Sequence, residues 1–115
     1  MTLKTTANAK PLPILPYGIG RNSLQGPQIS LDFQFRNGNR HGFSYAFLSE
    51  IEYDASGVIR LVFGGTQVEI RGRNLLELYE RLLLHGVGYV LESPKAARGD
   101  TWPFIETISV RKEES

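Results

Sequence analysis

Alternation of apolar and polar residues begins at Ile29 and marks the first expected strand. In the segment 29–36, ISLDFQFR, every second side chain is apolar, so one side of the strand is apolar and the other is polar. Asn37-Gly38 follows, and this dipeptide is typical of a hairpin turn because both residues tolerate a positive φ. The alternation resumes in the segment 43–47, FSYAF. We therefore expect a hairpin with one face turned to the core.

Further strands are expected in the middle of the chain. The sequence EIEYD at 50–54 alternates acidic and apolar residues, which predicts a strand. The sequence VIRLVF at 58–63 is apolar on both faces except at its arginine, a pattern typical of a central strand. Gly64-Gly65 predicts a second hairpin turn, and VEI at 68–70 predicts the strand that leaves it.

An amphipathic helix is expected at about 75–85. Its apolar side chains recur at the spacing i, i+3, i+4, i+7 and i+8, namely at Leu75, Leu78, Tyr79, Leu82 and Leu83. Asn74 is the expected N-cap, with Glu77 completing an arrangement similar to a capping box. Gly86 stands where a C-terminal glycine belongs. The segment IRGRN at 70–74 is therefore interpreted as the corner where a strand becomes a helix.

Two later strands complete the expected fold, one in VGYVLES at 87–93 and one at 104–110. The elements predict an α+β fold: a strongly curved antiparallel sheet or open roll of about six to seven short strands, with the helix packed on its apolar face. A chain of 115 residues is expected to hold one such domain, at residues 29–111, followed by a solvated tail at 112–115.

The first 28 residues differ from the rest because four of the six prolines lie there. Proline fixes φ and removes an N–H donor, so we expect a flexible tip and an extended Pro/Gly-rich arm at residues 1–28. The apolar side chains of this arm are candidates for contact with a partner, at Leu12, Ile14, Leu15 and Tyr17. Pro13 to Pro16 also fits the PxxP pattern of a polyproline II ligand.

Composition narrows the classes of function. The formal charge is +1, from 13 basic and 12 acidic residues, so no net field attracts nucleic acid or an anionic membrane. Absence of cysteine excludes disulfides, thiolate zinc sites and cysteine nucleophiles. Prolines interrupt the apolar run near the N-terminus, and no segment approaches about 20 apolar residues, so we expect neither a signal peptide nor a membrane span. The expected location is the cytoplasm.

Basic residues near two turns form a candidate site for an anion or a nucleic acid: Arg36, Arg40, His41, Arg71 and Arg73. The last two flank the start of the expected helix, where backbone N–H groups attract anions. Phosphate or an RNA backbone is the ligand expected there.

The segment IRGRNL at 70–75 is similar to the second signature of the Sm-like RNA-binding proteins, an Ile-Arg-Gly-x-Asn-apolar turn between two strands. That family places the Arg and Asn of this loop around a base. The resemblance covers six residues, and the sequence departs from the family in two ways. A helix is expected after the segment instead of a strand, and EIEYDASGVIR lacks the Asp-x-x-x-Asn loop. No family is assigned.

Other polar residues suggest little chemistry. Glu50, Glu52 and Asp54 share one strand face, where carboxylates bind a cation or act in acid–base catalysis, or where their charge prevents pairing with other chains. Only His41 and His85 are histidines, and no ligand spacing accompanies them, so no metal site is expected. Trp102 is a candidate for contact with a partner, or it clamps a loop onto the core.

These observations favour a non-enzymatic interaction or assembly module, which needs no cofactor. Its expected partner is another copy of the chain, giving a homo-oligomer, or a different protein. The first alternative is a small β domain that binds an anion or RNA through its basic turn residues. The second alternative is an enzyme with a carboxylate site near Glu50, Glu52 and Asp54.

Overall fold

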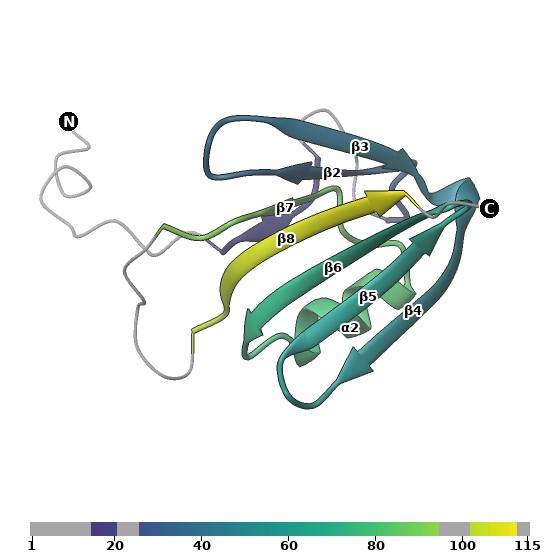
Figure 1. Cartoon of the computed structure of the whole chain (residues 1–115). Helices are drawn as coiled ribbons and strands as arrows, with labels where there is room; N and C mark the ends of the chain where they lie inside the picture. Colours follow the sequence, from purple (N-terminus) through teal and green to yellow (C-terminus); the bar gives the residue numbers. More distant parts are fainter. Residues whose placement is uncertain (1–14, 21–25, 95–101, 113–115) are drawn as a thin grey trace, which may run out of the picture.

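The computed structural model describes residues 15–20, 26–94 and 102–112. Within these residues the chain forms eight strands in two four-stranded sheets, together with one α-helix and one 3-10 turn. The expected α+β composition is therefore confirmed. The expected single curved sheet or open roll of six to seven strands is not, because the strands divide between two sheets (Figure 1). No helix of the described residues is long and apolar enough to cross a membrane.

The first sheet joins segments that are far apart in the sequence. Its strands, in spatial order, are β1 (Tyr17–Gly18), β7 (Tyr89–Leu91), β2 (Ser30–Gln34) and β3 (Arg40–Ser44). β2 and β3 form the hairpin expected at Asn37-Gly38, where Gly38 has φ +96°. β7 lies parallel to β2 and antiparallel to β1. The parallel pair arises because β7 follows a helix that returns the chain to this sheet.

The second sheet is antiparallel throughout. Its strands, in spatial order, are β4 (Leu48–Asp54), β5 (Val58–Phe63), β6 (Thr66–Arg73) and β8 (Phe104–Lys112). The 3-10 turn η1 (Tyr45–Phe47) carries the chain from β3 into β4. The alternation expected through residues 43–47 is therefore broken, and Tyr45 is buried whereas Phe47 is exposed.

One apolar core lies between the two sheets and α2 (Leu76–Leu83), which Figure 1 shows behind β4, β5 and β6. Leu78 and Leu82 of the helix are fully buried, as the helical spacing predicts. Stacking of the Phe43 and Phe63 rings, with centroids 4.6 Å apart, joins β3 to β5 across the core. The phenylalanines of both sheets thereby hold the two layers together.

Side chains close the boundary between the sheets where β7 ends near β8. The carboxylate of Glu92 accepts hydrogen bonds from the backbone N–H groups of Arg36 (2.7 Å) and Ile108 (2.8 Å). The guanidinium of Arg36 donates to the carbonyl oxygens of Ser93 and Glu106. The two charged side chains thus satisfy backbone N–H and carbonyl groups at the boundary between the sheets.

The ends of α2 differ from the sequence prediction. Asn74 is not the N-cap: the cap is Leu75, which makes no side-chain capping bond, and Asn74 has φ +59°. At the other end His85, and not Gly86, adopts positive φ (+57°). The N–H groups of His85 and Gly86 donate to the carbonyls of Leu82 and Arg81, which is the Schellman arrangement.

Candidate functional site

The corner at residues 70–74 uses its side chains within the fold. Arg71 pairs with Glu69 at 3.1 Å, and the guanidinium of Arg73 lies 4.7 Å from the centre of the Phe104 ring. The register between β6 and β8 shifts at Gly72, where Glu106 of β8 has no partner on β6. The amide of Asn74 donates to the carbonyl of Trp102 at 3.2 Å. In the Sm-like signature the turn joins two strands, whereas here it joins β6 to α2.

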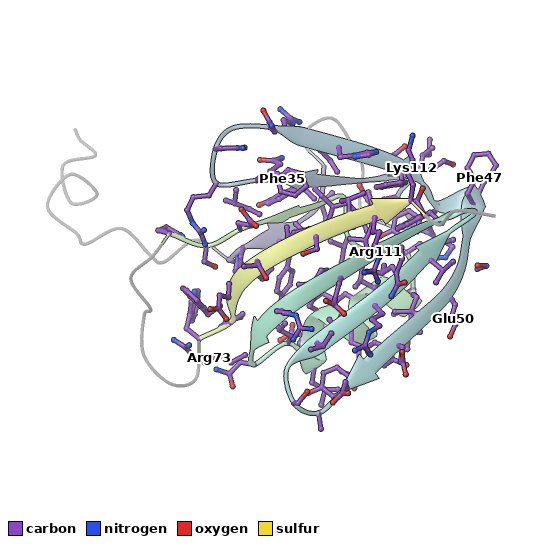
Figure 2. The ribbon with its side chains drawn as sticks, viewed as in Figure 1. Phe35, Phe47, Glu50, Arg73, Arg111 and Lys112 are labelled. Carbon is purple, nitrogen blue, oxygen red and sulfur yellow. The ribbon has the colours of Figure 1, made fainter. Side chains whose placement is uncertain are left out.

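The basic candidates on the first hairpin are also engaged. Arg36 belongs to the boundary between the sheets. Arg40 forms a salt bridge with Asp32 at 2.6 Å, and the ring of His41 stacks on Phe43 at 4.4 Å. Figure 2 labels Arg73 at the end of β6, on the other sheet from this hairpin. The anion or nucleic-acid site stays a prediction, and each of its five residues has a partner within the chain.

The acidic candidates lie on β4, at the edge of the second sheet. Arg60 of the neighbouring strand pairs with Glu52 (3.4 Å) and with Glu69 (3.1 Å). Desolvation lowers the pKa of Arg60, but hydrogen bonds to Glu69 and Glu52 outweigh it and the pKa is raised. Hydrogen bonds from Ser56 lower the pKa of Asp54. Of the three acidic candidates, Glu52 is therefore the one that pairs with an arginine, and Asp54 is engaged by Ser56.

Metal ligands do not gather in the described part of the chain, where no group of three or more His, Cys, Asp or Glu side chains is placed to hold an ion. Glu50, labelled in Figure 2, points away from the body of the domain.

The candidates for partner contact separate into different environments. Tyr17 lies in the core of its own chain, and its strand β1 pairs with β7. Burial raises the pKa of Tyr17, Glu77 adds to the rise and Arg81 opposes it. Leu15 packs partly buried against the same core, and Trp102 is partly buried. The other two candidates, Leu12 and Ile14, lie outside the described residues.

Sequence reasoning missed an apolar surface beside α2. The helix leaves Leu76 and Leu83 half exposed and Leu84 is 76% exposed. Ile29 is 83% exposed, and the backbone N–H of the preceding residue, Gln28, donates to the carbonyl of His85 just after the helix. We call Ile29, Leu76, Leu83 and Leu84 the α2 apolar surface. Consecutive helical residues point about 100° apart, so three leucines in a row at 82–84 could have indicated it.

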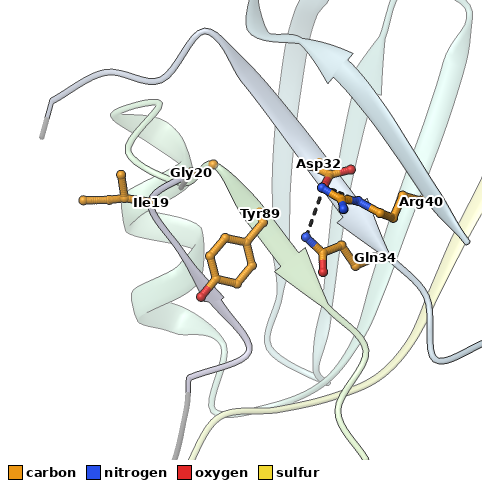
Figure 3. Close-up of a pocket in the computed structure, with 7 residues that line it drawn as sticks. Ile19, Gly20, Asp32, Gln34, Arg40 and Tyr89 are labelled. Carbon is orange, nitrogen blue, oxygen red and sulfur yellow. Dashed lines mark hydrogen bonds and ion pairs between the residues drawn. The ribbon is translucent and has the colours of Figure 1, made fainter. Parts of the chain in front are cut away.

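A second feature that the sequence did not reveal is a recess on the outer face of the first sheet (Figure 3). Its volume is about 740 Å³. Among the described residues its lining comprises Ile19, Gly20, Asp32, Gln34, Arg40, Gly88 and Tyr89. Arg40 is the only one of the five basic candidates in that lining. The recess therefore differs from the site expected at the turns.

Comparisons with known proteins reveal no relative. No family model matches the chain, and no similar protein was found among curated proteins or among solved structures.

Proposed function

We propose that the chain is a non-enzymatic interaction module that binds another protein chain through the α2 apolar surface. The observation that carries the proposal is the exposure of Leu76 and Leu83, which stand seven residues apart on one face of α2, together with that of Leu84 and Ile29. Single exposed leucines are ordinary on protein surfaces, whereas neighbouring large apolar side chains mark contact sites. Burying one such side chain fully contributes roughly 1.5–3 kcal/mol.

The partner that we propose for the α2 apolar surface is the same surface on a second copy of the chain. A two-fold axis through α2 would place the helices antiparallel, so that each apolar surface covers its counterpart. Glu77 and Arg81 pair within each helix at 3.0 Å, and in that arrangement the pair of one helix would lie beside the pair of the other. The charges at the rim are therefore complementary as well.

Sedimentation velocity tests the proposal. The wild-type chain is expected to gain mass toward the dimer as concentration rises, and Leu83→Ser with Leu84→Ser to remain a monomer. Phe47→Ser is the matched control, because Phe47 is also 66% exposed but belongs to η1. A wild-type chain that stays monomeric at every concentration would contradict assembly with a second copy. An equal loss of assembly in the control would remove α2 as the contact surface.

The N-terminal arm is a further contact that we propose to test. Deleting residues 1–14 removes two of the apolar candidates, Leu12 and Ile14, and keeps Leu15 and Tyr17. If the arm bridges subunits, this deletion lowers the sedimentation mass. An unchanged mass would reject the arm as the bridge, while α2 stays open to the test above.

A further inference from the structure

The outer face of the first sheet carries a row of residues that runs across its four strands. Strand pairing places Gly18 beside Tyr89, Tyr89 beside Asp32, and Asp32 beside Gly42. Glycine at both ends leaves the tyrosine and the aspartate as the only side chains of the row. Both of these side chains line the recess.

The tyrosine ring in this row is held flat. A Cβ built at Gly18 would lie 3.0–3.2 Å from the hydroxyl and two ring carbons of Tyr89, so the ring lies directly on that glycine. Figure 3 shows the ring of Tyr89 across β1, and this ring lines the recess and is partly exposed. A rigid aromatic face is thus available to a ligand at a small cost in side-chain entropy.

Polar side chains that line the recess with this ring still have donors and acceptors available for further hydrogen bonds. The Oδ2 atom of Asp32 accepts three hydrogen bonds, from Nε (2.9 Å) and Nη2 (2.6 Å) of Arg40 and from Nε2 of Gln34 (3.1 Å). Among the described residues, the Oδ1 of Asp32, the Oε1 of Gln34 and the hydroxyl of Tyr89 make no hydrogen bond. Nη1 of Arg40 also has donors to spare.

The balance of charge defines the ligand class. Asp32 and Arg40 neutralise each other, so the recess favours neither an anion nor a cation. Its wall offers acceptors on Asp32 and Gln34 and donors on Arg40 and Tyr89. A suitable ligand is neutral, both donates and accepts hydrogen bonds along its edge, and has an apolar face for the aromatic ring.

We propose that this recess binds a saccharide. Each sugar hydroxyl donates and accepts at once, which matches the mixed wall, and the C–H face of a pyranose packs on one aromatic ring. A nucleobase shares the hydrogen-bonding pattern, but it gains most when apolar surfaces cover both of its faces. The described lining offers one aromatic face and an open side. The site is separate from the α2 apolar surface, so either function can fail without the other.

Titration of the ¹⁵N-labelled full chain tests the proposal. The probes are D-glucose, D-galactose, D-mannose and N-acetyl-D-glucosamine, with adenosine and guanosine as the comparison. At least one sugar is expected to produce saturable amide shifts at Asp32, Gln34, Gly88 and Tyr89, with no shifts on β4 to β6. Absence of saturable shifts with every sugar, or tighter binding of a nucleoside, would overturn the proposal.

Three variants assign the contacts. Tyr89→Ala is expected to weaken binding at least tenfold, and Tyr89→Phe to keep the ring and lose only the hydroxyl contribution. Asp32→Asn is expected to weaken binding severalfold. It keeps the test valid if Tyr89→Ala fails to fold. Glu52→Gln is the matched control, because it alters a carboxylate–arginine pair on the other sheet and should leave the affinity unchanged. Sugar binding that survives both Tyr89→Phe and Asp32→Asn at full strength would contradict the assignment.

Discussion

At the scale of single residues, His85 at the end of α2 has a backbone conformation that histidine disfavours, and a contact of its side chain offsets the cost. His85 has φ +57°, a conformation that glycine adopts without strain and other residues adopt at a cost. Its ring stacks on Tyr45 with centroids 4.4 Å apart. The hydroxyl of Tyr45 in turn donates to the carbonyl of Val87 at 2.6 Å. Histidine at this position therefore links the helix end to the core.

Two substitutions at His85 separate the ring from the backbone. His85→Ala loses the stacking and keeps the unfavourable φ, whereas His85→Gly loses the stacking and removes the strain. We expect His85→Gly to be more stable than His85→Ala by about 1 kcal/mol in urea denaturation. Equal stability of the two variants would show that the positive φ carries no strain at this position.

Tyr45 is predicted to make stability depend on alkaline pH. Burial raises the pKa of Tyr45 above its ordinary value, because the ionised form would lose its hydration. The unfolded chain ionises tyrosine near pH 10, at about its ordinary pKa. Folding stability from this group is therefore complete below about pH 10 and is lost as the pH rises above it.

Tyr45→Phe tests this dependence. The variant is expected to lose roughly 1–3 kcal/mol at neutral pH, because the carbonyl of Val87 loses its donor. Above pH 10 its free energy of unfolding should fall less steeply than that of the wild type. Tyr17→Phe, which removes another tyrosine of raised pKa, should change the slope in the same direction. Parallel slopes for Tyr45→Phe and wild type would contradict the role given to burial.

At the scale of elements, Gly72 of β6 allows the close approach of β8 where the register between these two strands shifts. A Cβ built at Gly72 would lie 1.9 Å from the carbonyl oxygen of Phe104, far inside any real contact. The atom in the way is backbone, which cannot rotate aside. Glycine is therefore required here by the neighbouring strand, and the corner that follows depends on it.

Gly72→Ala is expected to destabilise the domain by about 1–3 kcal/mol or more, because β6 and β8 must move apart. Gly65→Ala is the matched control, since nothing lies within 4 Å of a Cβ at that position. Chemical denaturation of both variants measures the difference. Similar stability of Gly72→Ala and the control would mean that the strands separate without loss.

At the scale of the whole molecule, the boundary between the sheets depends on Glu92. Its carboxylate satisfies one N–H on the loop after β2 and another on β8. Removing it would leave the partly buried N–H of Ile108 without this partner. The two sheets are expected to remain folded around the common core but to separate more often at this boundary.

Glu92→Ala is predicted to cost roughly 1–3 kcal/mol and to increase hydrogen exchange at the amide of Ile108. Glu106→Ala is the matched control. Glu106 lies on β8, the strand of Ile108, and its carboxylate makes no hydrogen bond to the described residues. Unchanged exchange at Ile108 in Glu92→Ala would show that the carboxylate does not hold the boundary.

Local patterns in the sequence predicted the hairpin at Asn37-Gly38, the central strand β5 and the buried face of α2. Each depends on neighbours within a few residues, which is where backbone propensity and side-chain period act. The ends of α2 were predicted wrongly because Asn74 contacts Trp102 and His85 contacts Tyr45, and no local pattern contains these contacts. Leu83 was predicted to belong to the buried stripe of the helix, but its side chain is 50% exposed.

The sequence by itself determined the α+β composition, most of the strands and the buried face of the helix, but not β1 or the 3-10 turn η1. Only the tertiary structure decided that the strands divide into two sheets, that β7 lies parallel to β2, and that Tyr89 stands beside Asp32. The physical reason is that alternation specifies which face of a strand is buried but not which strand lies next to it. Lateral pairing between distant segments is selected by packing of the whole core.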